Sequence, residues 1–243
     1  MKKNALITGA SRGIGKAAAI TFARAGYSLS LCCKNSREQL TALAGQLQQE
    51  YGIQVLTFTG DVGDFLFVQE MVSKTLEMFG QLDVLINNAG ISYIGLLTDM
   101  DIADWNRIVS VNLTSVFSTC RLVVPSMVSA KSGRIINISS VWGNAGASCE
   151  VAYSACKGGI NAFTKALGKE LAPSGICVNA IACGMIDTDM NRCFTEAEHA
   201  ALMDEIPAGR MGTPEEVAQL ALSLATGPAY LNGQVITLDG GWI

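Results

Sequence analysis

Short apolar runs alternate along the chain with longer segments in which apolar residues recur at helical spacing. The runs have the length and composition of β-strands, and they lie at residues 3–8, 29–33, 55–59, 82–86, 133–139, 175–181 and 234–238. The helical segments lie at residues 16–25, 36–51, 65–79, 101–129 and 151–171, and a further helix begins at Thr213. Strands that alternate with helices form parallel sheets covered on both faces. The pattern therefore predicts an α/β fold built on a doubly wound parallel sheet of about seven strands.

No repeat, linker or low-complexity segment divides the chain, so we expect one domain over residues 1–243. Hydrophobic residues make up 49% of the chain and charged residues 16%. This composition is apolar for a soluble monomer, and it predicts that part of the surface is buried between subunits. The net charge of -4 argues against a nucleic-acid partner, because such binding depends on Lys and Arg.

The N-terminus and the cysteines indicate a cytoplasmic protein. The apolar run behind residues 1–3 is too short for a signal peptide, and no uncharged apolar stretch reaches membrane-spanning length. The eight cysteines show no CxxC spacing and mostly lie in apolar runs, which favours reduced, packed thiols. A structural zinc site is the alternative, but the missing ligand pairs and the single histidine, His199, predict no metal.

A glycine-rich turn follows the first predicted strand and precedes a helix. It contributes Gly9, Ser11, Arg12, Gly13, Ile14 and Gly15. Glycine is needed where a Cβ would block a close approach, and the backbone N–H groups and positive helix end attract a diphosphate. A plain tight turn is the alternative, but the flanking strand and helix supply the context of a Rossmann-type dinucleotide site.

The end of the second strand favours NADP(H) over NAD(H). NAD enzymes usually place Asp or Glu here to bind the adenosine ribose. This chain instead has Cys33, Lys34 and Asn35. Lys34 and Arg12 supply two cations and no carboxylate, which suits a 2′-phosphate. A solvated loop lysine is the alternative for Lys34.

The next two strand ends add polar groups to the same crevice. Asp61 and Val62 end the third strand on the cofactor side, where a short polar side chain can reach an adenine edge. The fourth strand is followed by Asn87, Asn88, Ala89 and Gly90, of which we assign the last three to the cofactor. The two amides either brace the strand or contact the cofactor, and bracing is the favoured main role.

Tyr153 and Lys157 lie one turn apart on the same face of a predicted helix. A tyrosine is a poor acid at neutral pH, but a neighbouring cation favours the phenolate and brings proton transfer within reach. The pair is a candidate general acid, and an ordinary solvated pair is the alternative. The same helix is rich in Gly and Ala, which predicts a packing face between subunits. The mixed polarity of residues 183–212 predicts a substrate lid.

These motifs together resemble the short-chain dehydrogenases/reductases over essentially the whole chain. They are Thr8-Gly-Ala-Ser-Arg-Gly-Ile-Gly15, Asn87-Asn-Ala-Gly90, Asn112, Ser140 and the Tyr153/Lys157 pair. TGASRGIG, GRIINISS and the closing LDGGW are similar to the 3-oxoacyl-(acyl-carrier-protein) reductases of fatty acid biosynthesis. The resemblance implies a homotetrameric, NADPH-dependent reductase of a small-molecule or carrier-bound ketone.

The resemblance also implies a role for each catalytic residue. Tyr153 donates a proton to the developing alkoxide, and Ser140 hydrogen-bonds the carbonyl oxygen. Lys157 binds the nicotinamide ribose and lowers the pKa of the tyrosine. Asn112 holds a water in the proton relay; from its place in an apolar helix alone, we expect it to bond backbone in a local kink, or a water or lysine.

The segment after the sixth strand departs from the family pattern at one position. Ile186 and Thr188 match positions that contact the nicotinamide carboxamide. Cys183 precedes Gly184 where the family usually has proline. Loss of the proline loosens this turn, which leaves the geometry of the lid open but not the chemistry.

A related group of bacterial reductases, which act on 5-aminopentanone-modified elongation factor P, provides an alternative substrate. The similar stretches are Ser139-Ser-Val-Trp-Gly143, Gly146-Ala-Ser-Cys-Glu150 and Ile186-Asp-Thr-Asp-Met-Asn191. Glu150 lies three residues before Tyr153, near the expected cleft mouth, where a carboxylate would repel an acidic acyl carrier and attract a cationic amine. A solvated acid at a helix start is the alternative for Glu150.

Two other functional classes fit the chain less well. A serine hydrolase is nearly excluded, because His199 lies in a charged run, where we expect it at the surface, and no GxSxG turn precedes a helix. A non-catalytic NADP-binding regulator on the same fold is the other class. Such regulators commonly lack part of the catalytic set, whereas this chain keeps all four members.

Overall fold

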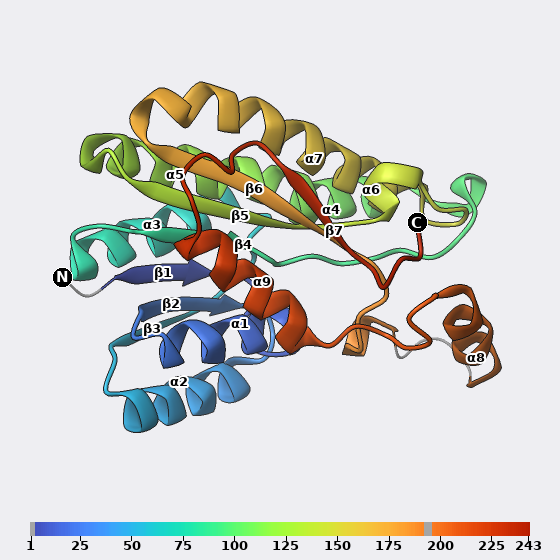
Figure 1. Ribbon diagram of the computed structural model, residues 1–243, viewed down its shortest axis with the longest axis horizontal. Coiled ribbons are helices and arrows are strands. Elements are labelled where there is room, and N and C mark those ends of the chain that lie inside the picture. Colours follow the sequence, from blue (N-terminus) through green and yellow to red (C-terminus); the bar gives the residue numbers. More distant parts are fainter. Residues whose placement is uncertain (1–2, 192–195) are drawn as a thin grey trace.

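A computed structural model describes residues 3–191 and 196–243, and its centre is a seven-stranded sheet (Figure 1). The strands are β1 (Asn4–Ile7), β2 (Ser28–Cys33), β3 (Val55–Thr59), β4 (Val84–Asn87), β5 (Gly133–Ser140), β6 (Ile176–Cys183) and β7 (Val235–Leu238). Their order is β3-β2-β1-β4-β5-β6-β7, and all neighbours are parallel. The order reverses between β1 and β4, which opens a crevice at the carboxyl ends of these strands. The predicted doubly wound parallel sheet is confirmed.

Helices cover both faces of the sheet (Figure 1). One face carries α1 (Gly13–Arg24), α2 (Arg37–Tyr51) and α9 (Pro214–Thr226). The other carries α3 (Phe65–Phe79), α5 (Ser115–Ala130) and α7 (Val151–Leu171), with α4 (Ile102–Val109) leading into α5. The short helices are η1 (Leu97–Asp99), η2 (Ser110–Thr114), α6 (Trp142–Ala145), η3 (Ala172–Ser174), η4 (Asp189–Asn191) and α8 (Glu196–Glu205). Figure 1 places α8 beyond the carboxyl ends of the strands.

Two apolar cores lie on opposite faces of the sheet. Along β1, Ala5 and Ile7 join the core under α1, α2 and α9, whereas Leu6 joins the core under α3, α5 and α7. All three side chains are fully buried, because both faces are covered. Burying a large side chain such as Leu6 contributes about 2 kcal/mol. Because side chains on both faces of the sheet are buried, the strands appear in the sequence as continuous apolar runs.

The long helix predicted over residues 101–129 is not a regular α-helix throughout. Asp101 caps its start by accepting a bond from the Asp104 N–H at 2.7 Å. The chain then passes through the π-helical turn η2 before it continues as α5. The amide of Asn112 is bonded to a backbone outside the helix, and a π-turn accommodates such a side chain by widening the local hydrogen-bond ladder.

The same segment, Ile102–Ala130, is long and apolar enough to cross a membrane on length and composition alone, although no uncharged stretch of it is that long. Half of its most apolar window is buried inside the fold. Its side chains Val116, Val123 and Met127 belong to the core between α3 and the sheet. A core helix of this kind passes the same composition test.

The cysteines within the described ranges are free thiols, and all but Cys149 are buried. In the same ranges no three His, Cys, Asp or Glu side chains are grouped so as to hold a metal ion. Met1, Lys2 and Cys193 lie outside the described residues, and so does the side chain of His199 that we expected at the surface.

Candidate active site

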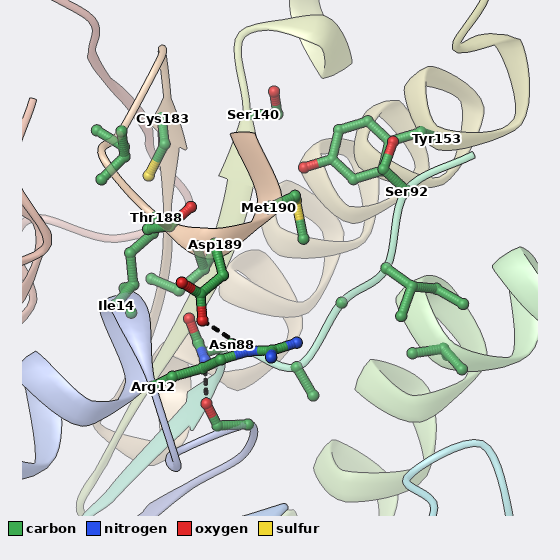
Figure 2. A pocket seen from close by; sticks show the side chains of 18 of the residues that line it. Arg12, Ile14, Asn88, Ser92, Ser140, Tyr153, Cys183, Thr188, Asp189 and Met190 are labelled. Atoms are coloured by element: carbon green, nitrogen blue, oxygen red, sulfur yellow. Dashed lines mark hydrogen bonds and ion pairs between the residues drawn. The ribbon is translucent and has the colours of Figure 1, made fainter. Parts of the chain in front are cut away.

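A cavity of about 630 Å³ opens at the carboxyl ends of the strands, where the strand order reverses. Every predicted cofactor residue lines it except Gly15, which lies beneath the glycine turn. Ser140, Tyr153, Lys157 and Glu150 also line it, whereas Asn112 lies behind the wall. In Figure 2, Ser140 and Tyr153 lie toward one end of the view, and Arg12 and Asn88 toward the other.

The glycine turn packs so closely against Asn88 and Ala89, which follow β4, that side chains on its glycines would not fit. A Cβ on Gly9 would lie 2.9 Å from the Cα of Ala89, and one on Gly15 would overlap the carbonyl oxygen of Gly9. Gly9 and Gly13 also have positive φ values of 67° and 51°, which favour glycine. Arg12 occupies the N-cap of α1 without a side-chain cap, so the first N–H groups of this helix are available to an anion.

Asn88 and Thr8 hold this turn against β4. The Nδ2 of Asn88 donates to the carbonyl oxygens of Thr8 at 2.9 Å and Gly9 at 3.1 Å. The hydroxyl of Thr8 accepts from the N–H groups of Asn88 and Ala89, both at 3.0 Å. Asn87 turns inward and bonds Asn137 at 2.9 Å. Both amides brace the strand end, as expected, and Asn88 also faces the cavity.

The predicted cations stand at the rim of the cavity, and each faces a carboxylate. Arg12 Nε lies 3.7 Å from Asp189 Oδ2, a pair drawn in Figure 2. Lys34 Nζ lies 2.9 Å from Asp61 Oδ2. Lys34 is therefore not the uncommitted loop lysine of the alternative interpretation. The positions directly after β2 hold Lys34 and Asn35 and no Asp or Glu, so the carboxylate beside Lys34 comes from Asp61 after β3.

Arg107 on α4 is a cavity residue that the sequence did not indicate. Its Nη1 lies 2.6 Å from the same Asp61 oxygen that Lys34 contacts. Burial would raise the pKa of Asp61, but hydrogen bonds from the Gly63 N–H, Lys34 and Arg107 outweigh it and hold the pKa at about 2. Asp61 is therefore ionised at neutral pH.

Asn112 is buried and makes its bonds to backbone. Its Oδ1 accepts from the Ile91 N–H at 2.9 Å, and its Nδ2 donates to the Ile91 carbonyl at 2.8 Å. A Cβ on Gly90 would lie 2.8 Å from Asn112 Oδ1 and 3.8 Å from Lys157 Nζ, so both groups converge on Gly90. Of the two roles open to a buried asparagine, the structure displays the backbone kink, and Oδ1 retains a second lone pair.

Ser140, Tyr153 and Lys157 meet where β5 ends and α7 begins. The Ser140 hydroxyl accepts from the Trp142 N–H at 3.2 Å. Lys157 Nζ donates to the Ile138 carbonyl at 2.8 Å and lies 5.3 Å from the centre of the Tyr153 ring. Lys157 is only 3% exposed, so the alternative of a solvated Tyr–Lys pair is wrong.

The pKa values of this pair differ from the sequence-based expectation. Burial raises the pKa of Tyr153 above its usual value, and Cys183 and Glu150 add to the shift while the Ser140 hydroxyl opposes it. Burial lowers the pKa of Lys157 to about 8. The expected lowering of the tyrosine pKa is not observed, because desolvation of the phenolate is the largest cause of its pKa shift and acts in the opposite direction. The phenol is therefore protonated at neutral pH.

Glu150 occupies the N-cap position of α7, but its side chain makes no capping hydrogen bond to the helix. Its Oε2 accepts from the Ser92 hydroxyl at 2.7 Å, and the side chain is half-buried in the cavity wall. It is not the freely solvated acid of the alternative interpretation. Within the described ranges no Lys or Arg forms an ion pair with it.

An aromatic pair closes the same end of the cavity. The rings of Trp142 and Trp242 meet edge to face with their centres 4.9 Å apart. The Trp242 Nε1 lies 3.3 Å from Glu205 Oε2, which ties the C-terminal segment to α8. Ile94 and Leu202 complete an apolar wall. Trp242 belongs to the closing LDGGW motif, but that motif alone did not assign it to the site. Leu202 belongs to no motif and had no sequence signal.

The segment after β6 lies over the glycine turn. Thr188 Cγ2 would lie 3.3 Å from a Cβ on Gly13, and Ile186 pairs with Gly212 in an isolated bridge. Cys183 stands where proline was expected, yet its carbonyl accepts from Val141 at 2.9 Å, and the next N–H donates to Leu238 at 2.9 Å. Neighbouring strands therefore hold this turn without a proline. Residues 192–195 of the predicted lid lie outside the described chain.

Comparisons with known proteins agree with this geometry. A family model described as short chain dehydrogenase matches residues 3–199. The uncharacterized oxidoreductase YmfI of Bacillus subtilis (strain 168) is 42% identical over 100% of this chain and 99% of its own length. The 3-oxoacyl-(acyl-carrier-protein) reductase FabG of Thermotoga maritima is 40% identical over 99% of this chain and 98% of its own. The crystal structure of YwfH, described as an NADPH dependent reductase involved in bacilysin biosynthesis, has a TM-score of 0.95 at 27% identity and covers 100% of this chain and 99% of that one.

Proposed function

Since this chain belongs to the short-chain dehydrogenase family and is an oxidoreductase that uses NADP(H), we propose that it reduces the keto group of a 3-oxoacyl thioester to the 3-hydroxyacyl form. One observation carries the proposal. Ser140, Tyr153 and Lys157 meet at one part of a cavity whose opposite rim holds the glycine turn and the cations Arg12 and Lys34. Because the chain belongs to a family of oxidoreductases, the alternative of a non-catalytic NADP-binding regulator is set aside.

The residues around the cavity fit NADP(H). The close approach of the turn at Gly9 and Gly15 leaves room for a diphosphate against the free N–H groups of α1. Arg12 and Lys34 provide the charge for a 2′-phosphate. The remaining contacts assigned to the cofactor are those of Ser11, Gly13, Ile14, Asp61, Val62, Asn88, Ala89, Gly90, Tyr153, Lys157, Ile186 and Thr188. When bound, NADPH supplies the hydride for the keto carbon.

Three side chains of the protein handle the substrate oxygen and its proton. Tyr153 carries its proton at neutral pH, because burial raises its pKa, and it donates that proton to the oxygen as negative charge develops there. Ser140 donates a hydrogen bond to the same oxygen and orients it. Lys157 lies 5.3 Å from the Tyr153 ring and supplies positive charge that stabilises the phenolate left behind. Asn112 fixes the loop at Ile91 behind them and offers its free lone pair to a relay water.

The shape of the cavity supports a substrate with an apolar chain. Apolar surface in the cavity that Tyr153 also lines comes from Ile94, Leu202, Trp142 and Trp242. Such surface suits the acyl part of a thioester, since burial of methylene groups stabilises the complex by about 0.8 kcal/mol each. A relative at 40% identity is a 3-oxoacyl-(acyl-carrier-protein) reductase, which points to the same substrate class.

Glu150 favours a second candidate, a 5-aminopentanone group on modified elongation factor P. Its carboxylate lies in the cavity wall, hydrogen-bonded to Ser92 at 2.7 Å. A half-buried carboxylate without a cationic partner in the described chain attracts an ammonium group and repels an acidic carrier. The two candidates differ in the charge at the end of the substrate, which makes them separable.

The test compares NADPH oxidation with an acetoacetyl thioester and with a 5-aminopentanone ketone, for the unchanged protein and for Glu150→Gln. If the thioester is the substrate class, it is reduced faster, and the variant leaves its rate unchanged or improves it. If the aminoketone is the substrate, the variant lowers its kcat/KM by about tenfold. Glu77→Gln, which removes an exposed acid on α3, controls for net charge. Failure to reduce either ketone contradicts both substrate proposals.

We also propose that the protein acts as a homotetramer in the cytoplasm. The exposed positions of α7 include the small residues Ala155, Ala162 and Ala166, and its C-terminal part also exposes charged side chains. Val151 at the start of α7 and Phe117 on α5 are 43% and 49% exposed. Small residues allow a second helix to approach closely, and exposed apolar side chains stabilise such a contact. The molar mass in solution, measured by light scattering, tests this assembly.

A further inference from the structure

Three charged side chains from separate segments meet at the rim of the cavity. Lys34 follows β2, Asp61 follows β3, and Arg107 lies on α4. Lys34 Nζ is 2.9 Å and Arg107 Nη1 is 2.6 Å from Asp61, and both contact the same oxygen, Oδ2. The other oxygen, Oδ1, accepts from the Gly63 N–H at 2.9 Å. One carboxylate is therefore shared by two cations.

The two cations are held differently. Arg107 extends from a regular helix, and one turn further on the Ser110 hydroxyl donates to the Gly63 carbonyl at 3.1 Å, so α4 is fixed to the turn that carries Asp61. Lys34 extends from a loop, and its side chain is 49% exposed compared with 36% for Arg107. Lys34 also has the longer unbranched and more flexible stem. Of the two, Lys34 is the cation able to exchange its partner.

The shared carboxylate creates competition at the predicted 2′-phosphate site. Lys34 must break its ion pair with Asp61 in order to bind a phosphate. The free energy of breaking this pair depends on which other groups still contact the Asp61 carboxylate. With Arg107 in place, Asp61 keeps a charged partner and a hydrogen bond from Gly63 after Lys34 has moved. Without Arg107, Lys34 would be the one described cation in contact with an ionised and partly buried carboxylate, and this carboxylate would hold it in place.

We propose that Arg107 is a positioning residue for cofactor selectivity: it neutralises Asp61, and this frees Lys34 to bind the 2′-phosphate that distinguishes NADP(H) from NAD(H). The inference rests on the proposed role of Lys34. Arg107 acts through Asp61 and Lys34 and touches neither the nicotinamide nor the substrate. Lys34 pairs with Asp61 in this structure, and Arg107 lowers the free-energy cost of breaking that pair.

Dissociation constants for NADPH and NADH, measured on the full chain by cofactor fluorescence, test the proposal. We expect Arg107→Gln to raise the Kd for NADPH about tenfold and the Kd for NADH less than about twofold. Arg107→Lys keeps the charge beside Asp61, so its Kd for NADPH should stay within about threefold of the original. Arg121→Gln makes the same charge change on an exposed part of α5 and should alter neither constant. Equal losses for NADPH and NADH in Arg107→Gln would mean a structural role and would overturn the proposal.

A double-mutant cycle with Lys34→Met separates action through Lys34 from direct attraction. Lys34→Met alone should raise the Kd for NADPH by about tenfold or more, because a charge-assisted phosphate contact is lost. In that background Arg107→Gln should cost less than about twofold, because no lysine remains to be released. If the increases in Kd for NADPH of the two single variants multiply in the double variant, Arg107 attracts the phosphate directly, which would contradict the inference. If Lys34→Met leaves the NADPH constant unchanged, the proposed phosphate role of Lys34 is wrong, a result distinct from failure of Arg107 alone.

Discussion

Burial shifts the pKa values of Tyr153 and Lys157 in opposite directions, and both shifts favour the uncharged form. The pKa of Tyr153 rises, and that of Lys157 falls to about 8. At neutral pH the phenol therefore holds a proton while most of the lysine is still charged. This combination suits a proton donor in a reduction, where the substrate oxygen becomes basic only as the hydride arrives.

Tyr153→Phe should remove turnover and preserve cofactor binding. The phenyl ring keeps the contact with Lys157 but has no proton to donate, so kcat should fall by about 10²- to 10⁴-fold. The Kd for NADPH should change by less than about twofold, since the ring and Lys157 remain in place. Steady-state kinetics and a fluorescence titration on the same preparation check both numbers. Turnover that survives the substitution would exclude Tyr153 as the proton donor.

Residue identities alone indicated most of the site, but not how its charges are paired. The one-turn spacing of Tyr153 and Lys157 and the cation at Lys34 were readable along the chain. Arg107 was not, because its partner Asp61 lies 46 positions away and nothing in a helical pattern indicates such a contact. The same holds for the bond of Glu150 with Ser92, which spans 58 positions.

At the level of helices and strands, contacts between the glycine turn and the residues after β4 hold the proposed diphosphate site in shape. Asn88 bonds the carbonyls of Thr8 and Gly9 from β4's exit loop, and Gly15 packs against both Gly9 and Asn88. The turn is therefore held by a neighbouring strand as well as by its own glycines. A side chain at Gly15 would separate these parts.

Gly15→Ala should distort the turn. Its Cβ would overlap the Gly9 carbonyl and lie 2.6 Å from Asn88 Nδ2, and a backbone carbonyl cannot move aside without shifting the turn. We expect a loss of about 1–3 kcal/mol of unfolding free energy and a Kd for NADPH raised at least about tenfold. Urea unfolding and cofactor titration measure the two effects.

Gly45→Ala is the matched control on α2. Gly45 is exposed within a helix, and a Cβ there would meet nothing within 4 Å. Alanine should therefore stabilise the protein by about 0.5–1 kcal/mol and leave the Kd for NADPH unchanged. If Gly15→Ala and Gly45→Ala change stability and the Kd for NADPH equally, the close contacts at Gly15 do not determine the conformation of the turn.

Element boundaries were predictable where local signals were strong. The helices at 65–79 and 151–171 begin and end where the apolar spacing predicted. Asn112 in an apolar helix predicted a local kink as one alternative, but not the partner of its amide. The π-helical turn η2 accommodates a bond between Asn112 and the distant Ile91 backbone, which no pattern within the helix indicates. The same bond fixes the loop behind Gly90 and Lys157.

At the scale of the whole molecule, buried thiols make stability depend on alkaline pH. Burial raises the pKa values of Cys32, Cys120 and Cys183 from 9.0 to about 12. In the unfolded chain these thiols ionise near their usual pKa, whereas in the native protein they keep their protons. Stability is therefore fully present below pH 9.0 and is lost as the pH rises toward 12. Lys157, with its pKa lowered from 10.5 to about 8, has the opposite effect over part of this range.

Between pH 9 and 10 the unfolding free energy should fall by about 2 kcal/mol. Each of the three thiols is about half ionised in the unfolded chain at pH 9 and costs about 1 kcal/mol over this step, and Lys157 offsets about 1 kcal/mol of the total. Urea unfolding under reducing conditions at pH 8, 9 and 10 measures this slope. Cys120→Ala should lower stability at pH 8 through the lost side chain but reduce the loss of unfolding free energy between pH 9 and 10 by about 1 kcal/mol. A pH-independent unfolding free energy would contradict the assignment to buried thiols.

Three features could be predicted from the amino-acid sequence: the alternation of strands and helices, the glycine turn and the Tyr153/Lys157 pair. Each depends on periodicity or spacing within one short segment, and together they predicted the parallel sheet and an NADP(H) site. The pairing of charges, such as Lys34 and Arg107 on Asp61, and the effect of burial on the pKa of Tyr153 became evident only in the folded structure. Contacts between distant segments and the exclusion of water arise from packing of the whole chain, and no local pattern encodes them.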